Sequence, residues 1–405
     1  MAMQQEKVAP TIPRGNNPFS SRFDNLPPKK ANCFPRVAYV LQGGGSLGAY
    51  QLGVVKGLLE AGYEPDWIAA TSIGAIQAAI IVGNPPERRV ERLQQFWERV
   101  APPAMFDYLG EFQTTLEAYN KIGAARALLF GQPDFFSPRW ASGEFPLWGD
   151  PTTLSFYDTS PLRKTLLELI DFDLLNSCMI RLSLGSVQVR TGHLIYFNNI
   201  NYRIEVDHIL ASAALPPGFP AIKIDEEVYW DGGVHSNSPL EVILEAIPAE
   251  NTLCFLIDCF GGPAYIPQSM SEIEERMKDI SYSTHAQRTI LNYLQRQKMR
   301  NSMAELKKHL TEEQKQQYAD LVDIGVPHHC TLVHLMYSAR IVKAASKDYN
   351  FGQVIISKRI ENGYQDAQAI LAEEEKWGFI PKDGKSRLYE APNNSSKLLR
   401  KLQNI

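Results

Sequence analysis

VAYVLQGGGSLG, residues 37–48, joins a strand-like run of apolar residues directly to a run of glycines. Further along the chain, a second apolar run ends in Ala70-Thr71-Ser72-Ile73-Gly74 and leads into another helical pattern. Strand–helix–strand–helix units of this length pair their strands in parallel through right-handed crossovers. The sequence therefore predicts an α/β fold that begins with strands at 36–42 and 66–71 and helices at 49–62 and 73–82.

The composition is that of an ordinary globular protein, with 44% hydrophobic and 21% charged residues in a chain of 405. A net charge of −4 argues against a nucleic-acid partner, because nucleic-acid-binding proteins usually carry a strongly basic domain. The five cysteines are odd in number and lack C-x-x-C spacing, so neither a disulfide framework nor a zinc site is expected. A reducing compartment fits this cysteine usage best.

The chain shows no targeting or membrane-spanning signal. Its first residues, Met1–Lys7, contain no apolar run, so we expect no secretory signal peptide. No stretch approaches the ~18 apolar residues that a spanning helix needs. We therefore expect a soluble, cytoplasmic protein whose membrane contact, if any, is peripheral. Export by a route without a cleaved signal stays open.

Composition divides the chain into four parts. Residues 1–35 are rich in Pro, Asn, Arg and Lys without periodicity, which predicts a flexible arm. The α/β pattern occupies 36–262, interrupted at 101–157 by an aromatic-rich insertion. We interpret this insertion either as an acyl pocket or lid, or as a satellite core packed on the sheet. Residues 263–380 are mainly helical apart from one strand, and 381–405 form a polar tail that we expect to be flexible.

The glycine run satisfies G-x-G-x-x-G between a strand and a helix, the context of a dinucleotide-binding fingerprint. That fingerprint also needs an acidic residue about 20 residues on, at the end of the next strand. Asp66 precedes that strand here, and the strand ends in Ala70-Thr71-Ser72 instead. A P-loop fails too, because no Gly-Lys-Ser/Thr follows the glycines. A nucleotide site is thus a remote alternative.

The same loop also suits an oxyanion hole. Gly43, Gly44 and Gly45 would expose unobstructed N–H groups at the positive end of a helix dipole. Ser72 lies where a nucleophile elbow would place it, on a sharp turn from strand to helix, with Gly74 permitting close approach after the turn. A structural glycine turn and an ordinary serine helix cap are the alternatives. Gly48 would let the first helix pack closely against the sheet.

A nucleophilic serine needs a base, and the best acidic candidate is Asp231 in YWDGGVHSNSP, residues 229–239. An apolar strand that ends in Asp-Gly-Gly places the carboxylate on a turn that other groups can approach, and we expect this strand to be a neighbour in a parallel sheet. His235 is the rival base. An Asp-Gly hairpin turn is the alternative without catalysis.

Four ordered motifs resemble the bacterial branch of the patatin-like phospholipase family. They are Gly43–Gly48, Ala70–Gly74, the loop Ala211–Pro220, and Asp231-Gly232-Gly233. The resemblance covers roughly 36–262, and the region beyond about 265 is similar to the C-terminal extension of one bacterial subgroup, for which the sequence suggests no chemistry. Two positions depart from the family pattern: Ala70 stands for a glycine, and Leu47 for a common Arg or Lys.

The resemblance implies a three-layer fold with a mostly parallel central sheet flanked by helices, plus a helical C-terminal extension. It implies a lipid acyl hydrolase of phospholipase A or lysophospholipase type, without cofactor or metal. Its site would comprise Ser72 as nucleophile, Asp231 as general base, Gly43, Gly44 and Gly45 as oxyanion hole, and Gly48, Gly74, Gly232 and Gly233 as support. Alternatives are an esterase acting on a non-membrane ester or polyester, and a regulatory protein with a weak site. Head group, acyl length and oligomeric state stay open.

Overall fold

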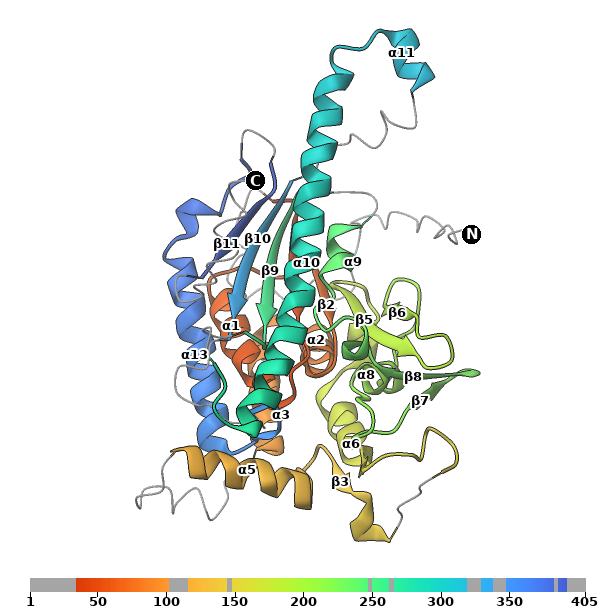
Figure 1. Cartoon of the computed structure of the whole chain (residues 1–405), viewed down its shortest axis with the longest axis vertical. Coiled ribbons are helices and arrows are strands. Elements are labelled where there is room, and N and C mark those ends of the chain that lie inside the picture. The colour runs from red at the N-terminus through yellow and green to blue at the C-terminus, as the bar shows by residue number, and fades with distance from the viewer. Residues whose placement is uncertain are drawn as a thin grey trace.

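The computed structural model describes residues 34–101, 116–143, 148–246, 250–261, 266–318, 329–337, 347–381 and 385–391. Figure 1 shows a sheet at the centre, helix α10 crossing in front of it and rising beyond it, and helices α1 and α13 side by side. Nearly all of the expected N-terminal arm lies outside the described residues, as do parts of the 101–157 insertion and residues 392–405 of the expected tail.

A single sheet organises the described chain, with nine strands in the order β11-β10-β9-β1-β2-β5-β8-β7 and β6 paired to β5. The strands are β1 (Arg36–Leu41), β2 (Trp67–Ala70), β5 (Arg181–Gln188), β6 (Leu194–Asn198), β7 (Ile222–Ile224), β8 (Glu227–Asp231), β9 (Thr252–Asp258), β10 (Cys330–Met336) and β11 (Arg387–Glu390). Every neighbouring pair from β11 to β5 is parallel, whereas β6, β7 and β8 pair antiparallel. The mostly parallel sheet predicted from the sequence is confirmed.

Helices connect most of the parallel strands of the sheet. They are α1 (Ala49–Glu60), α2 (Ile73–Val82), α3 (Pro86–Val100), α5 (Leu116–Phe130), α6 (Ser160–Leu169), α7 (Phe172–Leu175), α8 (Val206–Ser212), α9 (Leu240–Leu244), α10 (Met270–Lys307), α11 (Glu312–Gln317) and α13 (Gln353–Leu371). Short 3₁₀ segments are η2 (Gly45–Gly48), η3 (Arg139–Ser142), η4 (Gly232–Val234), η5 (Lys347–Tyr349) and η6 (Glu374–Lys376), and β3 (Ser137–Pro138) pairs with β4 (Tyr157–Asp158) apart from the main sheet. Of the helices described, none is long and apolar enough to cross a bilayer.

Both faces of the central strands are buried, because successive side chains point to opposite sides and helices cover each side. Tyr39 and Phe255 belong to the larger hydrophobic core, which includes buried residues of α1, α2, α3 and α13. Val40 and Leu256 belong to a second core, which is shared with α9 and α10. The predicted three-layer α/β arrangement is therefore confirmed.

Two expectations about single strands were wrong. Part of the tail expected to be flexible forms β11, which pairs in parallel with β10 and buries Leu388. A four-residue edge strand with one buried side chain has too little alternation to be recognised in the sequence. The strand that ends at Asp231 is antiparallel to β5 because it returns from β7 as a hairpin. The single strand expected in the extension is β10, which lies beside β9 in the same sheet.

Candidate active site

Ser72 occupies a sharp turn between β2 and α2, with φ 59° and ψ −129°. Such a backbone conformation costs a residue with a side chain about 1–3 kcal/mol, so neighbouring groups must hold it in place. The Ser72 N–H donates to the Ser212 carbonyl at 2.9 Å and lies 3.3 Å from the Ser212 hydroxyl. That hydroxyl donates in turn to the Gly185 carbonyl at 2.6 Å. Helix α8 and strand β5 therefore fix the turn from one side.

The rest of the elbow motif shows which positions tolerate a side chain. A Cβ at Gly74 would stand 2.3 Å from the carbonyl oxygen of Leu41, so α2 can begin this close to β1 only with glycine there. Ala70 is fully buried in β2 and is paired with Leu41 and Leu184 in the neighbouring strands. Its methyl group is accommodated in the core, and the sharp turn forms although the usual glycine is missing.

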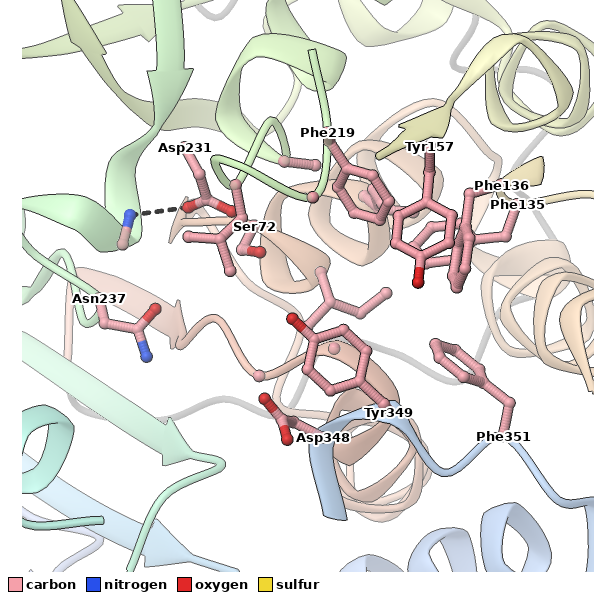
Figure 2. Close-up of a pocket in the computed structure, with 18 of the residues that line it drawn as sticks. Ser72, Phe135, Phe136, Tyr157, Phe219, Asp231, Asn237, Asp348, Tyr349 and Phe351 are labelled. Carbon is pink, nitrogen blue, oxygen red and sulfur yellow. Dashed lines mark hydrogen bonds between the residues drawn. The ribbon is translucent and has the colours of Figure 1, made fainter. Parts of the chain in front are cut away.

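Asp231 ends β8, where the register with β5 sets it opposite Ser186. Its side chain is 1% exposed, and its Oδ1 accepts the Gly233 N–H at 2.7 Å. Its Oδ2 is buried and accepts no hydrogen bond of ordinary geometry from the described residues. Figure 2 shows the Ser72 side chain next to this carboxylate, at the edge of a pocket.

The burial of Asp231 changes its acidity. Loss of hydration raises the pKa of Asp231 from 3.8 to about 7, while the nearby Ser72 hydroxyl and the Gly233 N–H oppose this rise. Catalytic bases work best when their pKa lies near the operating pH, and their hydrogen bonds to the nucleophile often tighten only when substrate is bound. The arrangement suits a carboxylate that takes and returns one proton near neutrality.

The turn after Asp231 is built from glycines that leave room beneath the carboxylate. A Cβ at Gly232 would lie 2.5 Å from the Gly185 carbonyl oxygen, and one at Gly233 would lie 3.0 Å from Asp231 Oδ1. His235, the rival base, is exposed just beyond this turn and does not line the pocket. No histidine of the described ranges lines it either.

The backbone N–H groups of the glycine loop differ in whether they already donate a hydrogen bond. The Gly43 N–H donates to the Asn237 carbonyl at 3.1 Å, and the Gly43 carbonyl accepts from the Asn237 side chain at 3.0 Å. Gly44 and Gly45 line the pocket, and within the part of the chain that the structure describes their N–H groups have no acceptor. Of the three amides expected to form an oxyanion hole, Gly43 is thus already hydrogen-bonded. Gly48 was expected to let the first helix pack closely against the sheet. In the structure its close neighbour is Ile73 of α2, whose Cγ1 atom would lie 2.7 Å from a Cβ added at Gly48.

An aromatic wall forms the far end of the pocket (Figure 2). Its members are Phe135, Phe136, Tyr157, Phe219 and Phe351, whose ring centroids lie 4.8 to 6.2 Å apart in edge-on or tilted contacts. Phe135, Phe136 and Tyr157 come from the predicted insertion. Phe135 and Phe136 also belong to the main hydrophobic core, so the described part of the insertion both lines the pocket and packs with the core. Elsewhere in it, Phe130, Trp140 and Trp148 are exposed.

Residues of the C-terminal extension complete the pocket, although the sequence suggested no chemistry for them. Tyr282 of α10, Asp348 and Tyr349 of η5, and Phe351 line it. The Asp348 carbonyl oxygen would lie 2.5 Å from a Cβ at Gly45, so this segment rests directly on the glycine loop. Gly45 itself has a left-handed φ of 54°.

Arg359 of α13 ties the glycine loop to the extension. It is 3% exposed and donates to the Ser46 hydroxyl at 2.8 Å and to the Asn350 carbonyl at 3.0 Å. Ser46 lies beside Leu47, where the family pattern would have a basic residue. Arg359 and Ser46 are 313 positions apart in sequence, and no motif connected them. Among the described residues, no group of His, Cys, Asp and Glu side chains is arranged to hold a metal ion.

Comparison with known proteins identifies the family. The model of the patatin-like phospholipase family matches residues 39–244, just over half of the chain, and a second family model, described as patatin phospholipase, matches residues 280–383. The chain therefore belongs to the patatin-like phospholipase family, a family of lipid ester hydrolases.

Individual relatives cover parts of this chain. The triacylglycerol lipase SDP1L of Arabidopsis thaliana is 37% identical over 98 residues, which are 24% of this chain and 12% of that protein. Similar solved structures include VipD from Legionella pneumophila, with 14% identity, a TM-score of 0.37, and coverage of 84% of this chain and 67% of that one. Another is the type III effector ExoU, with 13% identity, a TM-score of 0.27, and coverage of 82% and 53%.

Proposed function

We propose that this protein is a lipid acyl hydrolase that cleaves carboxylic esters with Ser72 as nucleophile and Asp231 as general base. The observation that carries the proposal is a serine held in a strained turn beside a buried carboxylate whose pKa is about 7. Family membership and the aromatic wall support a lipid acyl group as the part that is bound. The relative from Arabidopsis, a triacylglycerol lipase, is consistent with ester cleavage in a lipid. The phospholipase A or lysophospholipase type expected from the sequence is one form of this reaction.

The first half-reaction forms an acyl-enzyme. The ionised Asp231 accepts the Ser72 hydroxyl proton while Oγ attacks the ester carbonyl carbon, whose oxygen becomes an oxyanion. Gly44 and Gly45 line the pocket, and their N–H groups, which have no acceptor among the described residues, would donate to this oxyanion. A single such donor typically contributes ~3–4 kcal/mol to the transition state. The bond between the carbonyl carbon and the alcohol oxygen then breaks, and Asp231 returns the proton to the departing alcohol.

The second half-reaction releases the fatty acid. Asp231 accepts a proton from water as the water oxygen attacks the acyl carbon of the Ser72 ester. The bond to Oγ breaks, Asp231 gives the proton back to Oγ, and the free acid leaves. One carboxylate thus serves as base and then as acid in each half, which requires a pKa near the working pH.

We also propose that residues 36–262 and 263–380 act as one catalytic unit, in place of two independent domains. Strand β10 of the extension pairs with β9, and Asp348, Tyr349 and Phe351 form part of the pocket that contains Ser72. Residues 101–157 belong to the same unit through the aromatic wall.

The proposal is tested by labelling with a fluorophosphonate probe and by hydrolysis of a short p-nitrophenyl ester. Ser72→Ala is expected to abolish labelling and to lower turnover by ~10⁴-fold or more, because nucleophile and base act as a unit. Ser302→Ala, which changes an exposed serine on α10, is the matched control and should label like the wild type. Wild-type turnover in a correctly folded Ser72→Ala protein would contradict the assignment. Equal rates on dispersed and monomeric esters of one acyl chain would favour the non-membrane esterase.

A further inference from the structure

Among the residues that the structure describes, the pocket beside Ser72 is lined by two carboxylates and by no cationic side chain. Of these described lining residues, only Asp231 and Asp348 are charged, and none is Lys, Arg or His. Proteins recognise phosphate groups mainly through guanidinium, ammonium and amide donors, so this lining is poorly suited to an anionic head group. The two N–H groups without acceptors, those of Gly44 and Gly45, are assigned to the oxyanion under the proposed function.

Asp348 has no part in the reaction scheme, but one of its carboxylate oxygens has no hydrogen-bond donor within the described part of the chain. Its side chain is 14% exposed, and Oδ2 accepts from Lys278 Nζ at 2.7 Å. Oδ1 is buried and has no hydrogen-bond donor among the described residues. A buried acceptor without a donor normally costs a protein about 1–3 kcal/mol, so such a group in a binding pocket indicates that the donor arrives with a ligand.

The position of Asp348 places this acceptor at the alcohol end of the pocket. Figure 2 shows its carboxylate on the same side as Ser72 and Asn237, away from the aromatic wall. With the acyl chain against the aromatic rings and the ester carbon at Ser72, the alcohol part extends toward Asp348. Two contacts hold the Asp348 carboxylate in place. The Asp348 backbone rests on Gly45, and Lys278, which donates to Oδ2, is itself held 5.3 Å from the centre of the neighbouring Tyr349 ring.

We propose that Asp348 selects the alcohol part of the substrate: its Oδ1 accepts a hydrogen bond from a free hydroxyl of a neutral acylglycerol, and its charge disfavours an anionic phosphodiester. The inference rests on the proposed function and deepens it by naming the lipid class. Lys278 does not line the pocket, but its ion pair with Oδ2 compensates part of the negative charge of Asp348. The carboxylate can therefore stay buried while Oδ1 remains available as a hydrogen-bond acceptor.

The test compares three lipids with one acyl chain in the same mixed micelles: 1-oleoylglycerol, 1-oleoyl-lysophosphatidylglycerol and 1-oleoyl-lysophosphatidylcholine. A p-nitrophenyl ester reports the working of the dyad separately. We expect the wild type to prefer 1-oleoylglycerol over the anionic lipid by ~10–100-fold in kcat/KM, since the phosphate would bring a like charge toward Asp348 whereas both lipids offer a free hydroxyl. A preference for either phospholipid by an enzyme that cleaves the p-nitrophenyl ester would overturn the inference alone. Failure to cleave any of the four esters would overturn the proposed function as well.

Two variants should shift this preference in opposite directions. Asp348→Asn keeps the shape but removes the charge, and should reduce the preference for 1-oleoylglycerol by ~10-fold. Lys278→Met leaves the Asp348 charge uncompensated, and should increase the preference. Lys308→Met, which removes a lysine from an exposed ion pair at the distal end of α10, is the matched control and should leave the ratio unchanged. Unchanged ratios in both pocket variants, or shifts of the same sign, would overturn the inference.

Discussion

Replacing Asp231 by asparagine should stabilise the folded protein at neutral and alkaline pH while it abolishes catalysis. Burial raises the pKa of this carboxyl from its ordinary 3.8 to about 7. A difference of about three pKa units corresponds to ~4 kcal/mol, since each unit is worth ~1.4 kcal/mol. The folded state binds the proton more tightly than the unfolded state, so the stabilisation is complete below about pH 4 and is lost as the pH rises through 7. Because asparagine does not titrate at this position, the variant keeps its stability as the pH rises.

The assay is urea denaturation of wild type and Asp231→Asn at pH values from about 5 to 8.5, followed by tryptophan fluorescence. Across the window between the two pKa values, the stability difference between wild type and variant should change by ~1.4 kcal/mol per pH unit in favour of the variant. Asp173→Asn removes a carboxylate whose side chain is 85% exposed, and should follow the wild type. Wild-type kcat/KM should rise with pH around an apparent pKa near 7, because only the ionised Asp231 can accept the Ser72 proton.

Two outcomes would refute this reasoning. A stability difference between wild type and Asp231→Asn that stays constant across the range would mean that the carboxylate is ionised throughout. Hydrolysis that remains undiminished down to about pH 5 would show the same for the base, because a group with a pKa near 7 is almost fully protonated there. Either result would show that burial does not raise the pKa of Asp231 to about 7, and the pH dependence derived from that pKa would be wrong.

Two further predictions concern the glycine loop. Gly45→Ala should lower the free energy of unfolding by about 1–3 kcal/mol and reduce kcat, because it combines a left-handed φ with a Cβ that lies 2.5 Å from the Asp348 carbonyl. Gly143→Ala has a φ of 79° but open space around the Cβ, so it carries only the backbone cost, and equal losses in the two variants would contradict the contact. Arg359→Met should cost about 2–3 kcal/mol in urea denaturation and lower kcat, because the hydrogen bonds from the guanidinium to the Ser46 hydroxyl and to the Asn350 carbonyl are lost. Ser46→Ala should cost less, and an unchanged kcat in the Arg359→Met protein would show that the loop needs no support from α13.

The sequence predicted those parts of the site that short-range patterns specify. The glycine run, the turn at Ser72 and the strand that ends at Asp231 each lie within a few residues of their own signal, because turns and strand ends depend on local backbone requirements. Their meeting in one place then follows from the order of the strands in the sheet. The structure shows Ser72 and Asp231 side by side, as the motif order suggested, and leaves their catalytic roles to the experiments above.

The remaining parts of the site depend on contacts between distant segments. Asp348 and Arg359 carry no motif, and they reach the glycine loop because β10 joins the sheet beside β9 and α13 packs against α1. The pairing of Gly43 with Asn237, which leaves Gly44 and Gly45 as the open amides, likewise involves residues 194 positions apart. The direction of β8 was mistaken because a hairpin with β7 reverses the chain before Asp231. Each of these outcomes is decided by tertiary packing, for which a single sequence gives no periodic signal.

The place of β9 in the sheet bears on how the protein is made. In the sheet, β9 lies between β1 and β10. A nascent chain that ends at Asp258 therefore contains both Ser72 and Asp231, but not β10, the strand that pairs with the outer edge of β9. Such a nascent chain presents the unpaired edge of a strand that is buried throughout in the finished protein, and other chains can join that edge. It also lacks the Asp348–Phe351 wall of the pocket. Under the proposed function, a chain that stops at Asp258 would therefore hold both catalytic residues but an incomplete pocket, and hydrolytic activity is expected only after the C-terminal residues have been added.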